Sequence, residues 1–105
     1  MYYISGFYKF KKLLNLKKNK IFLQNYFIKK GIRGTVIISK EGINGTLSTN
    51  KKNLDLVLNK IKLIFNFKNF DSLNTSKSYF QPFHRGKVKI KKEVVPMGIK
   101  INKRK

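Results

Sequence analysis

The sequence predicts an α+β domain in which two helices cover one face of an antiparallel sheet. Three observations support this fold class. Two long stretches carry apolar residues at helical spacing, and five shorter stretches have the apolar or alternating character of strands. Along the chain they follow one another as strand, helix, strand, strand, helix, strand, strand, which is the ferredoxin-like order with one extra C-terminal strand.

The first strand is expected over residues 4–10. In an extended chain Phe7 and Lys9 share one face, whereas Tyr8 and Phe10 share the other. Both faces therefore carry an aromatic side chain, which favours a mostly buried strand in the middle of the sheet.

The first helix is expected over residues 16–30. Asn15 is a candidate N-cap, and Gly31 follows two lysines, as is typical of a helix end. Its apolar stripe, interpreted as core, consists of Leu16, Leu23 and Phe27, extended by Ile21 and Ile28.

A hairpin is expected next, with its first strand over residues 33–40. Asn44-Gly45 is a strong turn signal because both residues tolerate positive φ. Gly42 adds a second flexible point, so we expect a loop wider than two residues, with Glu41 and Asn44 exposed at its rim. An Asn in such a turn serves turn geometry more often than ligand binding.

The third strand is expected over residues 46–49, and the second helix over residues 51–65 with Asn50 as its N-cap. A fourth strand, residues 73–79, is polar, which places it at or near an edge of the sheet. The second helix has the clearest helical period, formed by Leu54, Val57, Leu58, Ile61, Ile64 and Phe65.

A fifth extended run is expected over residues 86–95, between Pro82 and Pro96. Alternation with Val88 and Ile90 places its lysines on one face, ~6.6–6.8 Å apart along the strand. This row is a candidate phosphate-binding site, and the alternative is a solvated strand face. The candidate RNA-binding residues are Arg85, Lys87, Lys89 and Lys91.

The net charge is +21, from 25 Lys and Arg against 4 Asp and Glu. An AT-rich genome accounts for Lys in place of Arg, but it does not account for the scarcity of acidic residues, whose codons are also AT-permissive. The charge therefore favours a polyanionic partner, with nucleic acid first and an anionic membrane surface second.

Several chemistries are excluded by composition. The absence of cysteine excludes disulfides, Cys-based metal sites and a catalytic thiol in this chain. The single histidine, His84, and four scattered acidic residues offer no metal cluster and no paired carboxylates, so no catalytic residue, metal or cofactor is expected here. No apolar run reaches the ~18 residues of a membrane span, and the N-terminus lacks the features of a signal peptide. The cytoplasm is the expected location.

Three known motifs fit parts of the chain incompletely. Residues 42–45 match the GXXG loop of KH domains by letter, but that loop joins helices and here it joins strands. The RRM shares the element order, yet residues 46–49 carry none of the aromatic residues that its third strand uses for base stacking. Acylphosphatases hold a phosphate with an Arg and an Asn, for which Arg33 and Asn44 are candidates, but their glycine-rich loop after the first strand is missing.

Two motifs at matching spacing resemble the N-terminal domain of the oxygen-dependent tRNA uridine(34) hydroxylases, a family with a rhodanese-like domain. One is residues 41–46 preceded by 34–38, and the other is residues 81–89 followed by 91–98. Residues 7–10 match the family's opening strand, and the likeness covers about residues 4–99. The family-motif residues are Glu41, Gly42, Asn44 and Gly45 in the predicted loop, with His84 and Arg85 before the fifth strand.

The resemblance implies an acylphosphatase-like variant of the ferredoxin-like fold, a tRNA partner, and participation in converting the wobble uridine to 5-hydroxyuridine. It also implies a rhodanese-like domain or subunit that supplies the active-site cysteine, which this chain does not contain. The expected organisation is a domain over residues 1–98, with a basic tail or the start of a linker over residues 99–105. The alternatives are a freestanding nucleic-acid-binding protein and a gene remnant without function.

Overall fold

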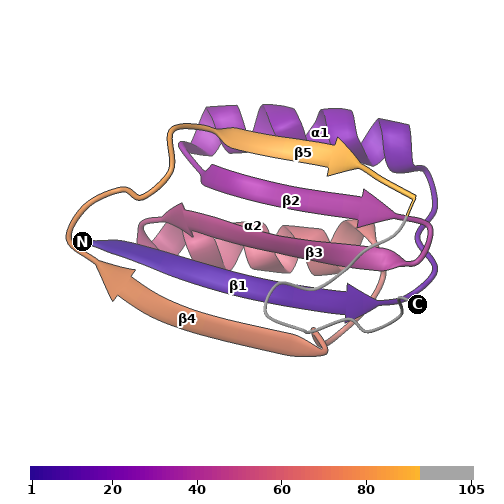
Figure 1. Ribbon diagram of the computed structural model, residues 1–105. Coiled ribbons are helices and arrows are strands. Elements are labelled where there is room, and N and C mark those ends of the chain that lie inside the picture. The colour runs from indigo at the N-terminus through magenta and orange to yellow at the C-terminus, as the bar shows by residue number, and fades with distance from the viewer. Residues whose placement is uncertain (93–105) are drawn as a thin grey trace, which may run out of the picture.

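One mixed sheet and two helices make up residues 1–92, the part of the chain that the computed structural model describes (Figure 1). The strand order across the sheet is β4-β1-β3-β2-β5. β5 runs parallel to β2, and the other three neighbouring pairs are antiparallel. The predicted ferredoxin-like α+β fold with an extra C-terminal strand is confirmed. In chain order the elements are β1 (Tyr2–Phe10), α1 (Leu16–Lys30), β2 (Arg33–Ser39), β3 (Gly42–Thr49), α2 (Lys51–Ile64), β4 (Ser72–Ser78) and β5 (Gly86–Ile90).

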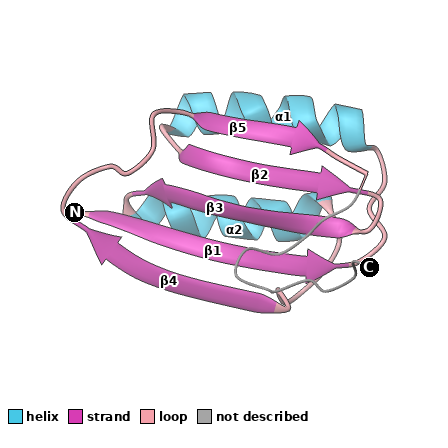
Figure 2. Cartoon of the chain, in the orientation of Figure 1, coloured by secondary structure: helices cyan, strands magenta, loops and turns pink. Residues whose placement is uncertain are grey.

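Both helices lie on one face of the sheet, with α1 along β5 and β2 and α2 along β3 and β1 (Figure 2). The core lies between the two layers, because the helical stripes and alternate strand residues meet there and leave water. It includes Leu23 and Phe27 of α1, Leu54, Val57, Leu58 and Ile61 of α2, and Phe7, Val36, Ile38, Ile43, Leu47 and Val88 of the strands. Neither described helix is long and apolar enough to cross a membrane.

The predicted stripe of α1 is confirmed only in part. Leu23 and Phe27 are fully buried, but Ile21 is 63% and Ile28 73% exposed. At about 100° per residue, positions two before and five after Leu23 lie on the opposite side of the helix. These two isoleucines therefore belong to the outer surface of α1.

Two of the three helix-end signals predicted from the sequence are confirmed. Asn50 caps α2, since its Oδ1 accepts a hydrogen bond from the Asn53 N–H at 2.8 Å. Gly31 closes α1 in the left-handed conformation, with φ of 66°. Asn15 occupies the N-cap position of α1, but it adopts the left-handed conformation and its side chain makes no capping hydrogen bond.

The hairpin between β2 and β3 is tighter than predicted. Ser39 pairs with Gly42, so only two residues form the turn. Asn44 and Gly45 lie inside β3, and the expectation that Asn44 is exposed at a wide rim is wrong, because it is 4% exposed. The local Asn-Gly turn signal is overridden because β3 pairs with β1 on one side and with β2 on the other. Glu41 is exposed, as expected.

The two edge strands are β4 and β5. The polar β4 confirms the edge position predicted for it. β5 is described from Gly86 to Ile90, and the ladder continues one step further because the Lys91 N–H donates to the Ile38 carbonyl at 2.9 Å. Residues 93–95 of the predicted run, and the predicted boundary between residues 98 and 99, lie outside the described residues.

Candidate nucleic-acid interface

The sheet presents a second face on which no described helix packs (Figure 2). We call it the helix-free face, and it is formed by the strand residues that alternate with the core residues. The registers set this face out in rows across the sheet. One row holds Ser72, Tyr8, Asn44, Ile37 and Lys89, and the next holds Asn74, Gly6, Thr46, Thr35 and Lys87.

The lysine row of β5 lies on this face. Lys87 pairs with Thr35 and Lys89 with Ile37, whereas Val88 between them is buried. Lys91 continues the same alternation through its hydrogen bond to β2. The predicted placement of the three lysines on one face is therefore confirmed, while their role in binding phosphate stays a prediction.

Arg85 precedes this row, and its backbone oxygen accepts a hydrogen bond from the Gly34 N–H at 2.9 Å. The neighbouring His84 is exposed. Arg33, at the start of β2, donates from Nη1 to the Phe83 oxygen at 3.4 Å. Two guanidinium groups thus lie on segments that meet at the start of β5.

The positive charge of β5 has no acidic counterpart within residues 1–92. Asp71 forms an ion pair with Lys9 at 3.3 Å, and Asp55 forms one with Lys51 at 2.8 Å. The remaining described acid, Glu41, takes part in no ion pair of this region. Since neither pair involves β5, no carboxylate of residues 1–92 neutralises the lysine row, which is the arrangement that attracts an external anion.

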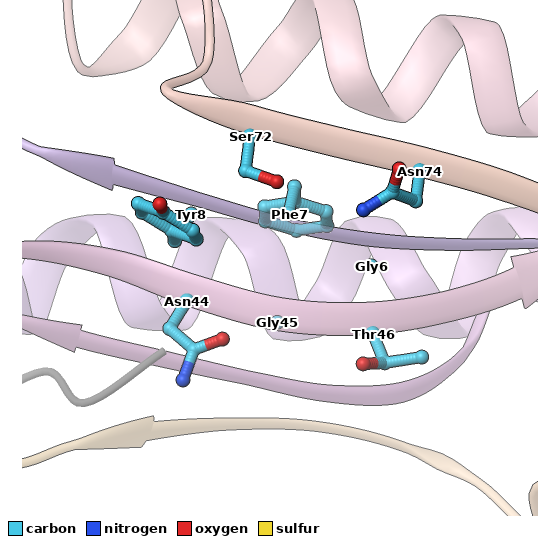
Figure 3. Close-up of a pocket in the computed structure, with 8 residues that line it drawn as sticks. All are labelled: Gly6, Phe7, Tyr8, Asn44, Gly45, Thr46, Ser72 and Asn74. Atoms are coloured by element: carbon cyan, nitrogen blue, oxygen red, sulfur yellow. The ribbon is translucent and has the colours of Figure 1, made fainter. Parts of the chain in front are cut away.

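A small hollow of about 100 Å³ lies on the helix-free face around Gly6 (Figure 3). Gly6 pairs with Thr46 on β3 and with Asn74 on β4, so the missing side chain leaves a gap between two longer ones. Tyr8 pairs with Asn44 and Ser72 and closes the hollow along the strands. The lining residues, none of them charged, are Gly6, Phe7, Tyr8, Asn44, Gly45, Thr46, Ser72 and Asn74.

Aromatic surface adjoins the hollow. The rings of Tyr8 and Phe10 meet edge to face with centroids 5.4 Å apart, and Phe10 is 50% exposed. The third strand lacks the aromatic residues of an RRM, but the first strand carries three on the helix-free face, Tyr2, Tyr8 and Phe10. Exposed rings of this kind can stack on unpaired bases.

The predicted site residues fall into separate places. Asn44 lies in the hollow, Gly42 and Glu41 lie at the β2–β3 turn, and Arg85 lies just before β5. By the usual strand spacing, Asn44 is ~10 Å across the sheet from Lys89. Sequence reasoning missed Gly6, Tyr8, Ser72 and Asn74 as site residues. The sequence feature that could have indicated the hollow is Gly6, a glycine within a strand rich in aromatic residues.

Within residues 1–92, no three His, Asp or Glu side chains lie close enough together to hold a metal ion. The carboxyl of Asp71 is held by hydrogen bonds at the end of β1. The Phe10 N–H donates to its Oδ2 at 2.7 Å, and this bond, with help from Lys9, holds the pKa of Asp71 below its ordinary value. Asp71 ties the end of β1 to the start of β4 and lies outside the hollow.

Comparison with known proteins places these features in a family. The family model described as the UPF0176 acylphosphatase like domain matches residues 2–94. A protein of Pelagibacter ubique named tRNA uridine(34) hydroxylase is 62% identical over 102 residues, which are 97% of this chain and 34% of that protein. A Rickettsia bellii protein of the same name is 37% identical over 71 residues, 68% of this chain and 28% of that protein. The chain thus spans about a third of the length of these relatives.

The fold is shared more widely. An acylphosphatase from Bacillus subtilis superposes with a TM-score of 0.57 at 13% identity, over 84% of this chain and 98% of that protein. At this identity the likeness shows the fold alone. The family match confirms the resemblance found in the sequence motifs: the chain belongs to the UPF0176 acylphosphatase-like domain family, whose members include tRNA uridine(34) hydroxylases.

Proposed function

We infer that this domain binds tRNA for the hydroxylation of the wobble uridine and that the helix-free face is its RNA-binding surface. The observation that carries the proposal is the lysine row of β5, which points away from the core and has no acidic partner within residues 1–92. The relatives' name supplies the substrate class, tRNA. A tRNA partner also favours the cytoplasm as the place of action.

We propose that this domain binds the RNA and that a partner domain carries out the chemical step. The sequence contains no cysteine and one histidine, so it offers no thiol nucleophile for a covalent or redox step. The family resemblance assigns that step to a rhodanese-like domain, which is the proposed partner of this domain, within one chain or as a separate subunit. The contribution of this domain is then to hold and orient the RNA.

Salt dependence tests the lysine row. Each phosphate contact releases counterions, so log K for tRNA should fall with log salt by about 0.7–0.9 per contact. Replacing Lys87, Lys89 and Lys91 together by Gln should weaken binding and flatten this slope by about 2–3 units. Binding is measured by fluorescence anisotropy with unmodified tRNA between low and physiological salt.

A matched control removes the same charge from the other layer. Lys18, Lys29 and Lys52 are exposed on α1 and α2, and their replacement by Gln should change the slope far less. Equal losses in both triple variants would mean that the protein binds as a diffuse polycation. Undiminished binding in the β5 variant would exclude the lysine row from the interface.

A further inference from the structure

The hollow at Gly6 is a neutral recess on the helix-free face, and Tyr8 of the aromatic strand β1 lines it (Figure 3). We propose that it is a nucleobase pocket, which takes the edge of one unpaired base of the bound RNA. The proposal rests on the proposed function, because it assigns a second and different role within the same face: the lysines bind phosphate and the hollow binds a base.

The chemistry of the lining favours a base over a phosphate. The hollow is lined by amide and hydroxyl groups and by no charged side chain. A side-chain amide has both hydrogen-bond donors and an acceptor, and so has the edge of a base. A phosphate has only acceptors and is usually bound by cationic side chains. Asn74 on β4 and Thr46 on β3 approach Gly6 from opposite sides, so a planar group entering between them meets polar atoms along both borders.

The aromatic wall adds a stacking surface. Tyr8 lies two residues from Gly6 on the same strand face, and its ring contacts the exposed ring of Phe10. Stacking on such rings is open to every base, because each has a π-face. Selectivity would then come from the amide and hydroxyl groups beside the ring.

The size of the hollow restricts what can enter. A volume of about 100 Å³ is smaller than the ~150 Å³ of an engineered protein cavity that takes up one benzene molecule. That space fits the edge of one planar ring and not a whole nucleotide. A base inside a duplex cannot present itself this way, so the pocket selects single-stranded RNA such as a loop.

The position of the hollow separates it from the lysine row. Gly6 on β1 and Lys87 on β5 lie in one row with β3 and β2 between them, which corresponds to ~14 Å across the sheet. The base in the hollow and the phosphates on β5 therefore belong to different nucleotides of one strand. That strand crosses the helix-free face from β5 toward β4.

Filling the hollow tests the proposal with little disturbance of the fold. A Cβ placed on Gly6 would lie 3.7 Å from the Thr46 Oγ1, an ordinary contact, so a side chain can be added there. Gly6→Val fills the recess, and its β-branched side chain suits a strand. We expect it to weaken tRNA binding by about 5- to 100-fold, as for the loss of one stacked base, with the salt slope unchanged because no phosphate contact is lost.

The control is Ser76→Val, which adds similar bulk to the same face of β4, beside Ile4 and outside the hollow. It should bind tRNA like the parent protein. A second pocket variant, Asn74→Ala, alters an exposed edge residue and guards against a folding defect in Gly6→Val. It should weaken binding in the same way, and thermal melting checks that each variant is folded.

A second arm uses free uridine as the probe and does not depend on tRNA. In ¹⁵N NMR spectra of the parent chain, uridine at millimolar concentration should shift the Asn74 side-chain amide and the Tyr8 backbone amide. The same addition to Gly6→Val should leave both unshifted. This arm reports on the pocket even when tRNA binding fails.

The outcomes separate the pocket from the proposed function. If both Gly6→Val and Asn74→Ala bind tRNA like the parent, the pocket proposal is overturned while the proposed tRNA binding stands. The same follows if Ser76→Val weakens tRNA binding as much as the pocket variants do. Absence of tRNA binding by the parent overturns the proposed function. In that case, uridine-induced changes in the NMR signals of the hollow residues alone uphold the pocket as a nucleobase site. If uridine changes none of these signals, the pocket proposal is overturned.

Discussion

Gln24 on α1 accepts a hydrogen bond from the backbone N–H of Val88 on β5, with its Oε1 3.0 Å from the nitrogen. The same side-chain amide donates from Nε2 to the Gly86 oxygen at 2.7 Å. One side chain thus occupies two backbone positions on the outer edge of β5, in the way that a neighbouring strand would. This contact fixes the edge strand that carries the lysine row, and it covers part of an edge that is otherwise open to other strands.

Replacing Gln24 by Leu should therefore destabilise the domain. The change leaves two backbone groups of β5 without their partner, at a cost of about 1–3 kcal/mol in the free energy of unfolding, measured by urea denaturation. Gln24→Glu is the matched control, because it keeps an acceptor for the Val88 N–H and loses only the donor to Gly86. Its stability should lie between the other two. A Leu variant as stable as the parent would show that the contact does not anchor β5.

Gly45→Val should destabilise the domain through packing. A Cβ at Gly45 would lie 2.8 Å from the Val36 Cγ2 and 3.0 Å from the Phe7 Cζ, so the core must move to accept it. The expected loss is about 1–3 kcal/mol, measured by urea denaturation. Gly6→Ala, on the neighbouring strand with room for its methyl group, should differ from the parent by less than about 0.5 kcal/mol. Equal stability of the two variants would contradict the packing described around Gly45.

The stability of the domain should depend on pH through Asp71. The Phe10 N–H, followed by Lys9, favours the carboxylate in the folded state, so the folded pKa lies below the unfolded pKa. The carboxylate then stabilises the fold above the unfolded pKa of about 3.9, and this contribution is lost as the pH falls through the folded pKa. Asp71→Asn should be less stable at pH 7 and should lose less stability between pH 5 and pH 2 than the parent. Identical acid dependence in both proteins would show that Asp71 does not contribute.

Purified alone, the chain should form no 5-hydroxyuridine in tRNA. It contains no cysteine, and the three-residue clusters that could hold a metal ion are absent from residues 1–92. The assay is incubation with unmodified tRNA in air, followed by mass spectrometry of the nucleosides. Robust product from this chain alone would overturn the assignment of the chemical step to a rhodanese-like partner.

The features predicted well from the sequence are those encoded locally. The apolar period of α2 and the cap at Asn50 fixed the start of that helix, and the alternation around Val88 placed the β5 lysines on one face. The prediction that Asn44-Gly45 forms the hairpin turn was wrong. These two residues lie inside β3 because that strand pairs with β1 on one side and with β2 on the other. Local sequence carries no information on that pairing.

The hollow was missed for a related reason. Gly6, Thr46 and Asn74 lie on three strands that are far apart in the sequence, and only the registers of β1 with β3 and β4 bring them together. A glycine in a strand can signal a bulge, a close backbone approach or a recess. The choice among these depends on neighbours that the sequence does not identify.

The position of RNA on the domain can be measured directly by ¹⁵N NMR with an unmodified anticodon stem-loop RNA as the ligand. We expect the shift changes to concentrate on the helix-free face, at the backbone amides of Lys87, Lys89 and Lys91 on β5 and of Gly6 and Tyr8 on β1. The outer surfaces of α1 and α2, represented by Lys18, Lys29 and Lys52, should change little. Shift changes centred on the helices, with β5 unaffected, would contradict the assignment of the helix-free face as the RNA-binding surface.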